Sequence, residues 1–209
     1  MTFALAMPRK FYLTYALIAA NILVYVYTSV VGGDFIVTAD EPILMFGQVN
    51  LFVFQGAYWQ LFTAMFVHAN IVHIASNMFF LLIFGLRAED LFKAKEYLLI
   101  YLLSGLAGNI LSLLFGPYAA PSVGASGAIF GVFGACTIYI RRAIGQPITS
   151  ALIYAFFFFF ISSFVPGVNF LAHLGGLAAG LLIGYALATR RRAQIRHEFT
   201  YTYPKQNWS

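Results

Sequence analysis

Two polar residues in apolar stretches of the chain, Ser126 and His173, could carry out nucleophilic catalysis. A serine hydroxyl becomes a good nucleophile only when a base within hydrogen-bonding distance takes its proton, and imidazole is the most common such base. Ser126 lies in Gly124-Ala-Ser-Gly127, where the glycines allow close approach of the backbone. A helix that begins there offers N–H groups that suit an oxyanion. We therefore predict Ser126 as nucleophile and His173 as base.

The elements that must position these residues lie in a membrane. The 209 residues are 61% apolar and only 9% charged, whereas soluble domains carry about 25% charged residues. This excludes a soluble globular protein, a disordered chain and a collagen-like repeat. The single cysteine, Cys136, excludes an intrachain disulfide framework and a metal site built from several cysteines.

Six apolar runs are close to the ~20 residues that a helix needs to cross the hydrocarbon core. We expect an all-α integral membrane protein: one domain over residues 1–209, folded as a six-transmembrane-helix bundle. The linker 32–59 is expected at the outer interface, and residues 189–209 form a basic tail. The expected spans are approximately 11–31, 60–86, 97–115, 123–140, 147–165 and 168–188.

The basic residues indicate the orientation, because Lys and Arg near span ends stay on the cytoplasmic side. All 12 fall in the N-terminal tail, in the loops after the second and fourth spans, and in the C-terminal tail. Both termini are therefore expected in the cytoplasm, and the second, fourth and sixth spans begin at the outer side. The net charge of +5 then reflects topology and not a nucleic-acid partner.

Three polar side chains on three spans share one depth. Counting ~1.5 Å per residue from the inner charges places His73, Ser126 and His173 at about 21, 22 and 26 Å, near the outer surface of the ~30 Å core. Asn77 lies one turn deeper on the face of His73, whereas His68 is expected near the surface on a different face. Polar groups at membrane depth are functional candidates.

Each residue also has a simpler interpretation. A serine beside glycines is typical of helix–helix packing, and a lone intramembrane histidine can be structural or can relay protons. Their shared depth favours a site.

A triad is not expected, and we predict a dyad whose imidazole is oriented by packing. None of the seven carboxylates falls in this layer: Asp34, Asp40, Glu41, Glu89, Asp90, Glu96 and Glu198.

Small residues on the fourth and sixth spans favour contact between them, because such stripes let helix backbones approach closely in lipid. His173 lies at the edge of the stripe on the sixth span, so it can meet Ser126 there. The fourth span carries Gly127 and Gly131, and the sixth carries Ala172, Gly176, Gly180 and Gly184.

These residues resemble the motifs of the rhomboid family of intramembrane serine proteases, in the same order along nearly the whole chain. The resemblance implies that Ser126 is the nucleophile and His173 the general base. It also implies an oxyanion hole formed by His73, Asn77 and the backbone N–H of Ser126. Supporting positions would be Gly124, Gly127, Phe130, Gly176, Gly180 and His68. The matching motifs are Trp59 before the second span, His68-x4-His73-x3-Asn77, Gly124-Ala-Ser126-Gly127 and Ala172-His173-x2-Gly176-x3-Gly180.

The same resemblance implies a cavity open to the extracytoplasmic side and cleavage of single-pass membrane proteins near the outer end of their span. The linker 32–59 would resemble the family's membrane-embedded loop, and the fifth span its gate. The partners are transmembrane substrates and membrane lipid, no cofactor or metal is implied, and no oligomeric state is predicted. The compact form suggests a prokaryotic plasma membrane.

Two positions depart from the family pattern. The family's Trp-Arg pair appears as Trp59-Gln60, so any hydrogen bonds of that arginine must be replaced or lost. Phe130 stands where the family often has a tyrosine under the catalytic histidine. The phenyl ring keeps the packing surface but lacks the hydroxyl.

Three alternatives stay open. The first is an inactive relative that binds membrane clients, against which the retained Ser126 and His173 argue. The second is a zinc site formed by His68, His73 and His173, against which the different faces of the first two argue. The third is a channel or transporter, which would need polar residues continuing below Asn77, where the spans are mostly apolar.

Overall fold

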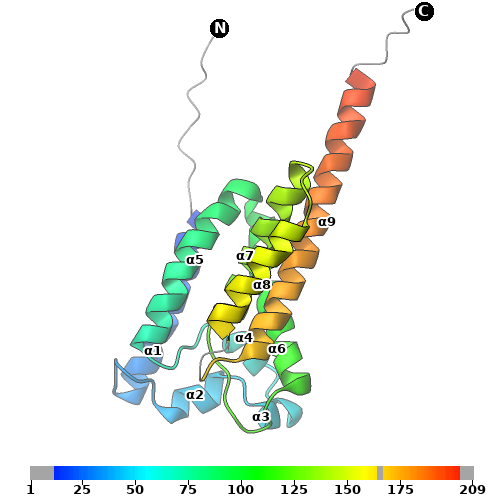
Figure 1. Ribbon diagram of the computed structural model, residues 1–209. Helices are drawn as coiled ribbons and strands as arrows, with labels where there is room; N and C mark the ends of the chain where they lie inside the picture. The colour runs from blue at the N-terminus through cyan, green and yellow to red at the C-terminus, as the bar shows by residue number, and fades with distance from the viewer. Residues whose placement is uncertain (1–11, 164–166, 203–209) are drawn as a thin grey trace, which may run out of the picture.

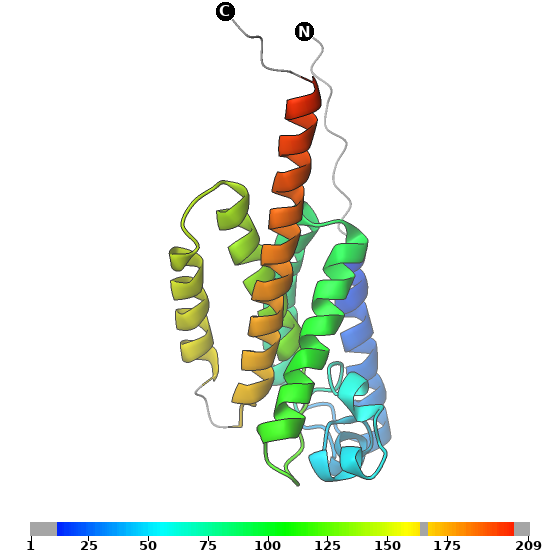
Figure 2. The same ribbon diagram turned by 90° about the vertical axis from the view of Figure 1, so that its right-hand side faces the viewer.

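Nine helices make up the described part of the chain, residues 12–163 and 167–202 of a computed structural model. The longer helices run side by side, and the short ones gather at the end where the second, fourth and sixth long helices begin (Figure 1, Figure 2). The helices are α1 (Tyr12–Gly32), α2 (Asp40–Phe46), α3 (Asn50–Phe54), α4 (Gln60–Thr63), α5 (Ile71–Leu91), α6 (Ala94–Phe115), α7 (Ser126–Ala143), α8 (Thr149–Ser163) and α9 (Phe170–Thr202).

Four of the described helices are long and apolar enough to cross a membrane: α1, α5, α6 and the segment Phe170–Ala193 of α9. The apolar α8 is shorter, with 15 residues, and α7 has 18. Large apolar side chains point outward, among them Leu23 on α1 and Ile161 on α8, which are 68% and 73% exposed. Lipid, and not water, suits such a surface. The protein is therefore an integral membrane protein of the all-helical class.

The centre of the bundle is the contact between α7 and α9, where the backbones approach closely. A Cβ atom added at Gly176 would collide with the carbonyl oxygen of Gly127, and one added at Gly180 with that of Gly131. This is the contact that the two stripes of small residues predict. It places the first turns of α7 and α9 side by side.

The second long helix begins later than the sequence suggests. The expected span starts near residue 60, but α5 starts at Ile71, and the short α4 and a turn precede it. The helix starts there because the side-chain oxygen of Asn70 accepts a hydrogen bond from the backbone N–H of His73, at 2.8 Å. Such a cap satisfies one of the N–H groups that a helix start leaves unpaired.

Gln60 ties the linker between α1 and α5 together. Its side chain is buried, accepts a hydrogen bond from the backbone N–H of Val49 at 2.9 Å and donates one to the carbonyl oxygen of Leu44 at 2.8 Å. Beside it, the indole N–H of Trp59 donates to the carbonyl oxygen of Met45 at 3.1 Å. Gln60 therefore supplies structural hydrogen bonds at the position where the family pattern has arginine.

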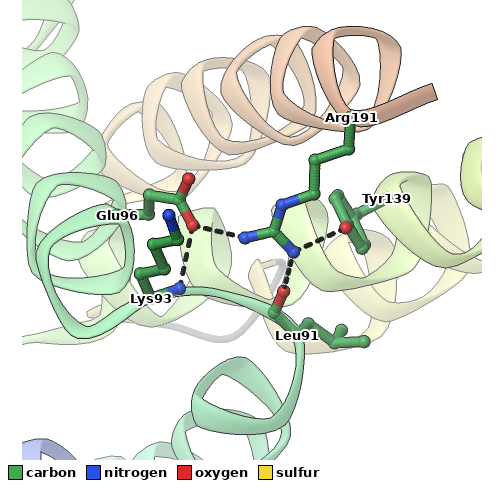
Figure 3. A network of polar contacts seen from close by, with 5 residues as sticks. All are labelled: Leu91, Lys93, Glu96, Tyr139 and Arg191. Carbon is green, nitrogen blue, oxygen red and sulfur yellow. Dashed lines mark hydrogen bonds and ion pairs between the residues drawn. The ribbon is translucent and has the colours of Figure 1, made fainter. Parts of the chain in front are cut away.

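Arg191 joins four elements at the opposite end of the bundle (Figure 3). Its guanidinium donates to the carbonyl oxygen of Leu91 at 2.6 Å and to the hydroxyl of Tyr139 at 2.7 Å, and it pairs with the Glu96 carboxylate at 2.6 Å. The same carboxylate accepts the backbone N–H of Lys93 at 2.8 Å. The part of α9 around Arg191 is thereby held to α5, to α7 and to the start of α6.

The last helix is also longer than expected. The sixth span was expected to end near residue 188, but α9 continues through the first part of the basic tail to Thr202. Alanine and arginine, which favour helices, are frequent just past that point. Residues 203–209 of the expected tail, like Arg9 and Lys10, lie outside the described residues.

Candidate active site

Ser126 and His173 meet where α7 and α9 begin. Ser126 is the first residue of α7, and His173 lies in the first turn of α9. The Ser126 Oγ and the His173 Nε2 are 2.7 Å apart, within hydrogen-bonding distance. The histidine is only 5% exposed.

The second ring nitrogen of His173 has a partner that the sequence did not suggest. The Ser163 Oγ, at the end of α8, lies 2.9 Å from the His173 Nδ1. Polar residues within a membrane span are costly and therefore candidates for a function. Ser163 falls in the expected span 147–165, so this signal was present in the sequence. The expectation that packing alone orients the imidazole is therefore incomplete.

Packing also contributes to the orientation of His173. The ring of Phe130 stacks on the imidazole, with centroids 4.3 Å apart and an angle of 28° between the planes. Phe158 and Phe159 from α8 contact Phe130 in turn. These two phenylalanines do not face lipid, whereas Phe156 and Phe157 are largely exposed, as expected for the lipid face of α8.

His73 presents a hydrogen-bond donor to the same place. The backbone N–H of Ala69 donates to the His73 Nδ1, at 3.5 Å, so the proton of the neutral ring is on Nε2. A Cβ atom built on Gly124 would lie 2.8 Å from this Nε2 and 3.8 Å from the Ser126 Oγ. The His73 Nε2 therefore faces the loop that carries the serine.

Asn77 lies one turn further along α5, as expected from its spacing. Its side-chain nitrogen donates to the carbonyl oxygen of His73 at 2.8 Å. Because an amide nitrogen carries two hydrogens, one remains for a second acceptor. Asn77 is 5% exposed and lies with His73, Ser126 and His173 on the wall of one cavity.

The expectation that His68 lies on a different helical face from His73 is wrong. His68 lies in the turn before α5 and is fully buried. Its ring packs edge-on against that of His73, with centroids 5.1 Å apart. The backbone N–H of Ala125 donates to its Nε2 at 3.5 Å, and its Nδ1 lies 3.2 Å from the carbonyl oxygen of Phe66. In a continuous helix, His68 would be rotated by about 140° from His73. This does not apply, because the helix starts at Ile71.

The environment of His68 also fixes its charge. It precedes α5 and so lies outside the four long apolar helices. Burial, more than the neighbouring His73, lowers the pKa of His68 to about 3. The ring is neutral at neutral pH and acts as a hydrogen-bonded support beneath the loop before Ser126.

Gly124 is the position in this loop that only glycine fits. Its φ of 122° is a conformation that residues with a side chain rarely adopt, and the space beyond it is filled by the His73 ring. Its N–H donates to the carbonyl oxygen of Ala64 at 2.9 Å. Gly127 in the first turn of α7 contacts Ala172 of α9.

A cavity of about 650 Å³ opens beside these groups. Residues of the first turns of α5, α7 and α9 line it. These three helices begin at the same end of the bundle (Figure 1). Asn169 braces the cavity wall: the side-chain nitrogen donates to the hydroxyls of Ser112 and Ser122, both at 2.7 Å, and the side-chain oxygen accepts the N–H of Ala172 at 3.0 Å. The sequence did not single out this residue. A peptide segment of a few residues fits such a volume.

The fold and the site together define a class: an α-helical membrane protein with a serine–imidazole pair in a cavity near one end of the bundle. Residues 55–190 match the family model of the Rhomboid domain. This is well over half of the chain, so the chain belongs to the rhomboid family, and the resemblance seen in the motifs is confirmed.

Relatives of this chain carry names of the same kind. The Rhomboid protease GluP of Bacillus subtilis (strain 168) is 36% identical over 183 residues, which is 83% of this chain and 34% of that protein. The Putative rhomboid protease YdcA of the same organism is 33% identical over 146 residues, 68% of this chain and 73% of YdcA.

A plant relative, the RHOMBOID-like protein 6, mitochondrial, of Arabidopsis thaliana, is 41% identical over 134 residues, 62% of this chain and 43% of that protein. The match to GluP and to this plant protein thus spans less than half of their length.

Proposed function

We propose that this protein is an intramembrane serine protease that cleaves single-pass membrane proteins near the outer end of their span. The observation that carries the proposal is the 2.7 Å separation of the Ser126 Oγ and the His173 Nε2 at the wall of a cavity, in a chain of the rhomboid family. In the first step His173 takes the serine proton as Oγ attacks the scissile carbonyl carbon.

The tetrahedral intermediate carries a negative oxygen that needs donors. The His73 Nε2–H, the free hydrogen of the Asn77 amide and the backbone N–H of Ser126 at the start of α7 are the proposed donors. The protonated His173 then gives its proton to the leaving amine, which leaves an acyl-enzyme. Water, deprotonated by the same imidazole, hydrolyses the ester and restores the serine.

The proposed topology has six membrane spans, formed by α1, α5, α6, α7, α8 and α9, with both termini in the cytoplasm. It rests on the basic residues of the loops and on the helix directions, since α5, α7 and α9 begin at the cavity end. The cavity then opens to the extracytoplasmic side. That the membrane is a prokaryotic plasma membrane stays a prediction.

The chemistry limits where a substrate span can be cut. The carbonyl groups of a helix are hydrogen-bonded and enclosed, so a transmembrane helix must unwind before Ser126 can attack it. We expect cleavage where small or helix-destabilising residues occur in the outer part of the substrate span. A stable helix of leucines should resist cleavage.

The test uses purified protein in liposomes, with a single-pass reporter whose span contains a Gly-Pro pair. We expect cleavage by the wild type in the presence of a metal chelator, and no cleavage by Ser126→Ala or His173→Ala. The matched control is Ser150→Ala. Ser150 lies at the start of α8, at the end of this helix away from the site, and its hydroxyl donates to the carbonyl oxygen of Pro147. This control should cleave like the wild type.

A fluorophosphonate probe identifies the nucleophile independently of the reporter. It should label the wild type and the control, and mass spectrometry should find the adduct on Ser126. Cleavage by the alanine variants would refute the dyad, and cleavage lost on chelation would favour the zinc interpretation. If unstable reporters stay intact and no probe binds, the client-binding interpretation replaces the protease.

A further inference from the structure

Ser163 is the last residue of α8 and is buried, with 3% of its surface exposed. Its Oγ lies 2.9 Å from the Nδ1 of His173, on the side of the ring opposite to Ser126. The imidazole is thus held at both nitrogens, by serines from two different helices. The mechanism above uses only one of them.

The chemistry of the dyad decides which group donates in this second bond. Ser126 must donate its proton to Nε2, so that nitrogen is unprotonated before the reaction and the neutral ring carries its proton on Nδ1. The Nδ1–H then donates, and the Ser163 Oγ accepts. An acceptor at this position favours the tautomer that can act as base, and it also stabilises the imidazolium that forms when Nε2 is protonated.

The contact depends on where α8 lies. This helix meets the bundle through a stripe of buried residues with a spacing of four, and through Phe158 beside that stripe, which packs against Phe130 and Phe133. The stripe consists of Ala151, Ala155, Phe159 and Ser163. Figure 2 shows α8 (yellow) at the edge of the molecule, and its other faces are largely exposed. Ser163 is the member of this stripe whose side chain can accept a hydrogen bond.

We propose that Ser163 is a positioning residue that sets the tautomer of His173, and that it does so only while α8 lies against α7 and α9. The proposal rests on the proposed protease function. Displacement of α8 from α7 and α9 would remove this acceptor from Nδ1.

Three substitutions at one position separate this role from simple packing. Ser163→Ala removes the acceptor, Ser163→Cys keeps the volume but offers only a weak acceptor, and Ser163→Thr keeps the hydroxyl. We expect the alanine and cysteine variants to lower kcat for the liposome reporter at least about tenfold, with little change in KM. Threonine should restore most of the rate, and Ser150→Ala on the same helix is the control.

A spectroscopic measurement reads the tautomer directly. The ¹⁵N shifts of histidine-labelled protein in detergent distinguish a protonated from an unprotonated ring nitrogen, and His173→Ala identifies the signals. In the wild type we expect the proton of His173 on Nδ1. In Ser163→Ala both tautomers should appear.

A wild-type kcat in both Ser163→Ala and Ser163→Cys would overturn the proposal. So would a lowered kcat that threonine does not restore together with an unchanged tautomer, because that pattern belongs to packing alone. A wild type that neither cleaves nor takes the fluorophosphonate would overturn the protease function instead. The two failures are distinguishable because the tautomer of His173 would still depend on Ser163.

Discussion

The three histidines around the site carry the same ring in three different hydrogen-bonding environments. His73 accepts a backbone N–H at Nδ1, so it offers a donor at Nε2. In the proposed mechanism His173 accepts at Nε2 from Ser126, and its own N–H lies on Nδ1, which faces Ser163. His68 accepts at Nε2 as well, but from the backbone beneath the loop. The neighbours of each ring, and not the residue type, decide whether it serves as donor, base or support.

The donors assigned to the oxyanion can be tested one at a time. His73→Ala and Asn77→Ala each remove one donor that acts mainly in the transition state, so kcat should fall about 10²–10³-fold while KM changes little. Reporter cleavage in liposomes measures both constants. Ile83→Ala, on the lipid-facing side of the same helix and 46% exposed, is the control. An unchanged kcat for either variant would remove that residue from the proposed oxyanion hole.

Gly124 gives a second test at the scale of a single residue. Gly124→Ala combines a strained backbone, at φ 122°, with a methyl group 2.8 Å from the His73 Nε2. The loop or the ring must shift, so we expect both fluorophosphonate labelling and cleavage to fall by more than about tenfold, because misplacing catalytic groups by ~1 Å can cost about 10²-fold.

The matched control for this glycine is Gly56→Ala. Gly56 has a similar φ, 108°, but a Cβ there would meet no atom within 4 Å. Backbone strain is common to the two variants, and the contact with His73 belongs to one of them. Equal activity of the two variants would show that the shape of the Gly124 loop does not control the site.

At the scale of the helices, the sequence predicts the features that the lipid environment requires. It does not predict a helix start that depends on a single hydrogen bond. The apolar runs place α1 and α6 nearly where they lie, because burial in hydrocarbon requires continuous apolar stretches. The small-residue stripes predict the α7–α9 contact because small side chains let helix backbones approach closely in lipid. The start of α5 depends on one cap, Asn70, within an apolar run. Periodicity does not reveal such a cap.

The residues of the site show the same difference between regular helical features, which the sequence reveals, and individual contacts, which it does not. Ser126 and His173 could be paired from the sequence because their depth and the glycine stripes are regular features of helices. Ser163 could not be paired with His173, because the contact depends on the angle of the short α8 and on the turn that joins it to α9. His68 was misplaced because its position follows from a helix start and not from a helical face.

The linker that covers the cavity end depends on Gln60, which makes two hydrogen bonds in a buried position. Gln60→Ala leaves the N–H of Val49 and the carbonyl of Leu44 without these partners. Each lost partner should lower the free energy of unfolding by about 1–3 kcal/mol where no water replaces it. We expect faster proteolysis within residues 40–63 and a lower Tm in detergent. The exposed Gln55→Ala in the same linker is the control. Equal proteolysis of the two variants would contradict the structural role of Gln60.

Close approach of α7 and α9 is the feature that brings the pair together, and Gly180 tests it. Gly180→Val inserts a side chain against the backbone of Gly131, so it should lower the stability by about 1–3 kcal/mol or more and separate the two helices. The Tm of unfolding in detergent and the labelling of Ser126 should both decline. Ala178→Val adds a similar volume on the exposed side of α9 and should leave both unchanged. A stable, fully labelled Gly180→Val protein would show that the contact is not required.

The molecule as a whole has two unlike ends. The cavity end carries the short helices α2, α3 and α4, and the pair Gln48 and Ser122 joins this linker to the loop before α7 through two backbone hydrogen bonds of 2.9 and 2.8 Å. The other end carries the Arg191 network (Figure 3) and the two arginines in the last turn of α7, Arg141 and Arg142. The linker is thus joined to the loop before the site by neutral hydrogen bonds, and the arginines named above lie at the far end.

This asymmetry makes the orientation testable with two introduced cysteines in a Cys136→Ala background. Tyr118, 58% exposed, lies in the loop before α7, and the exposed Gln146 lies in the loop after it. If α7 spans the membrane with both termini in the cytoplasm, an impermeant maleimide should label Tyr118→Cys on intact cells and should label Gln146→Cys only after permeabilisation. The reverse pattern would invert the molecule and place the cavity at the cytoplasmic face. Labelling of both from outside would mean that α7 does not cross, and the proposed six-span bundle would then be wrong.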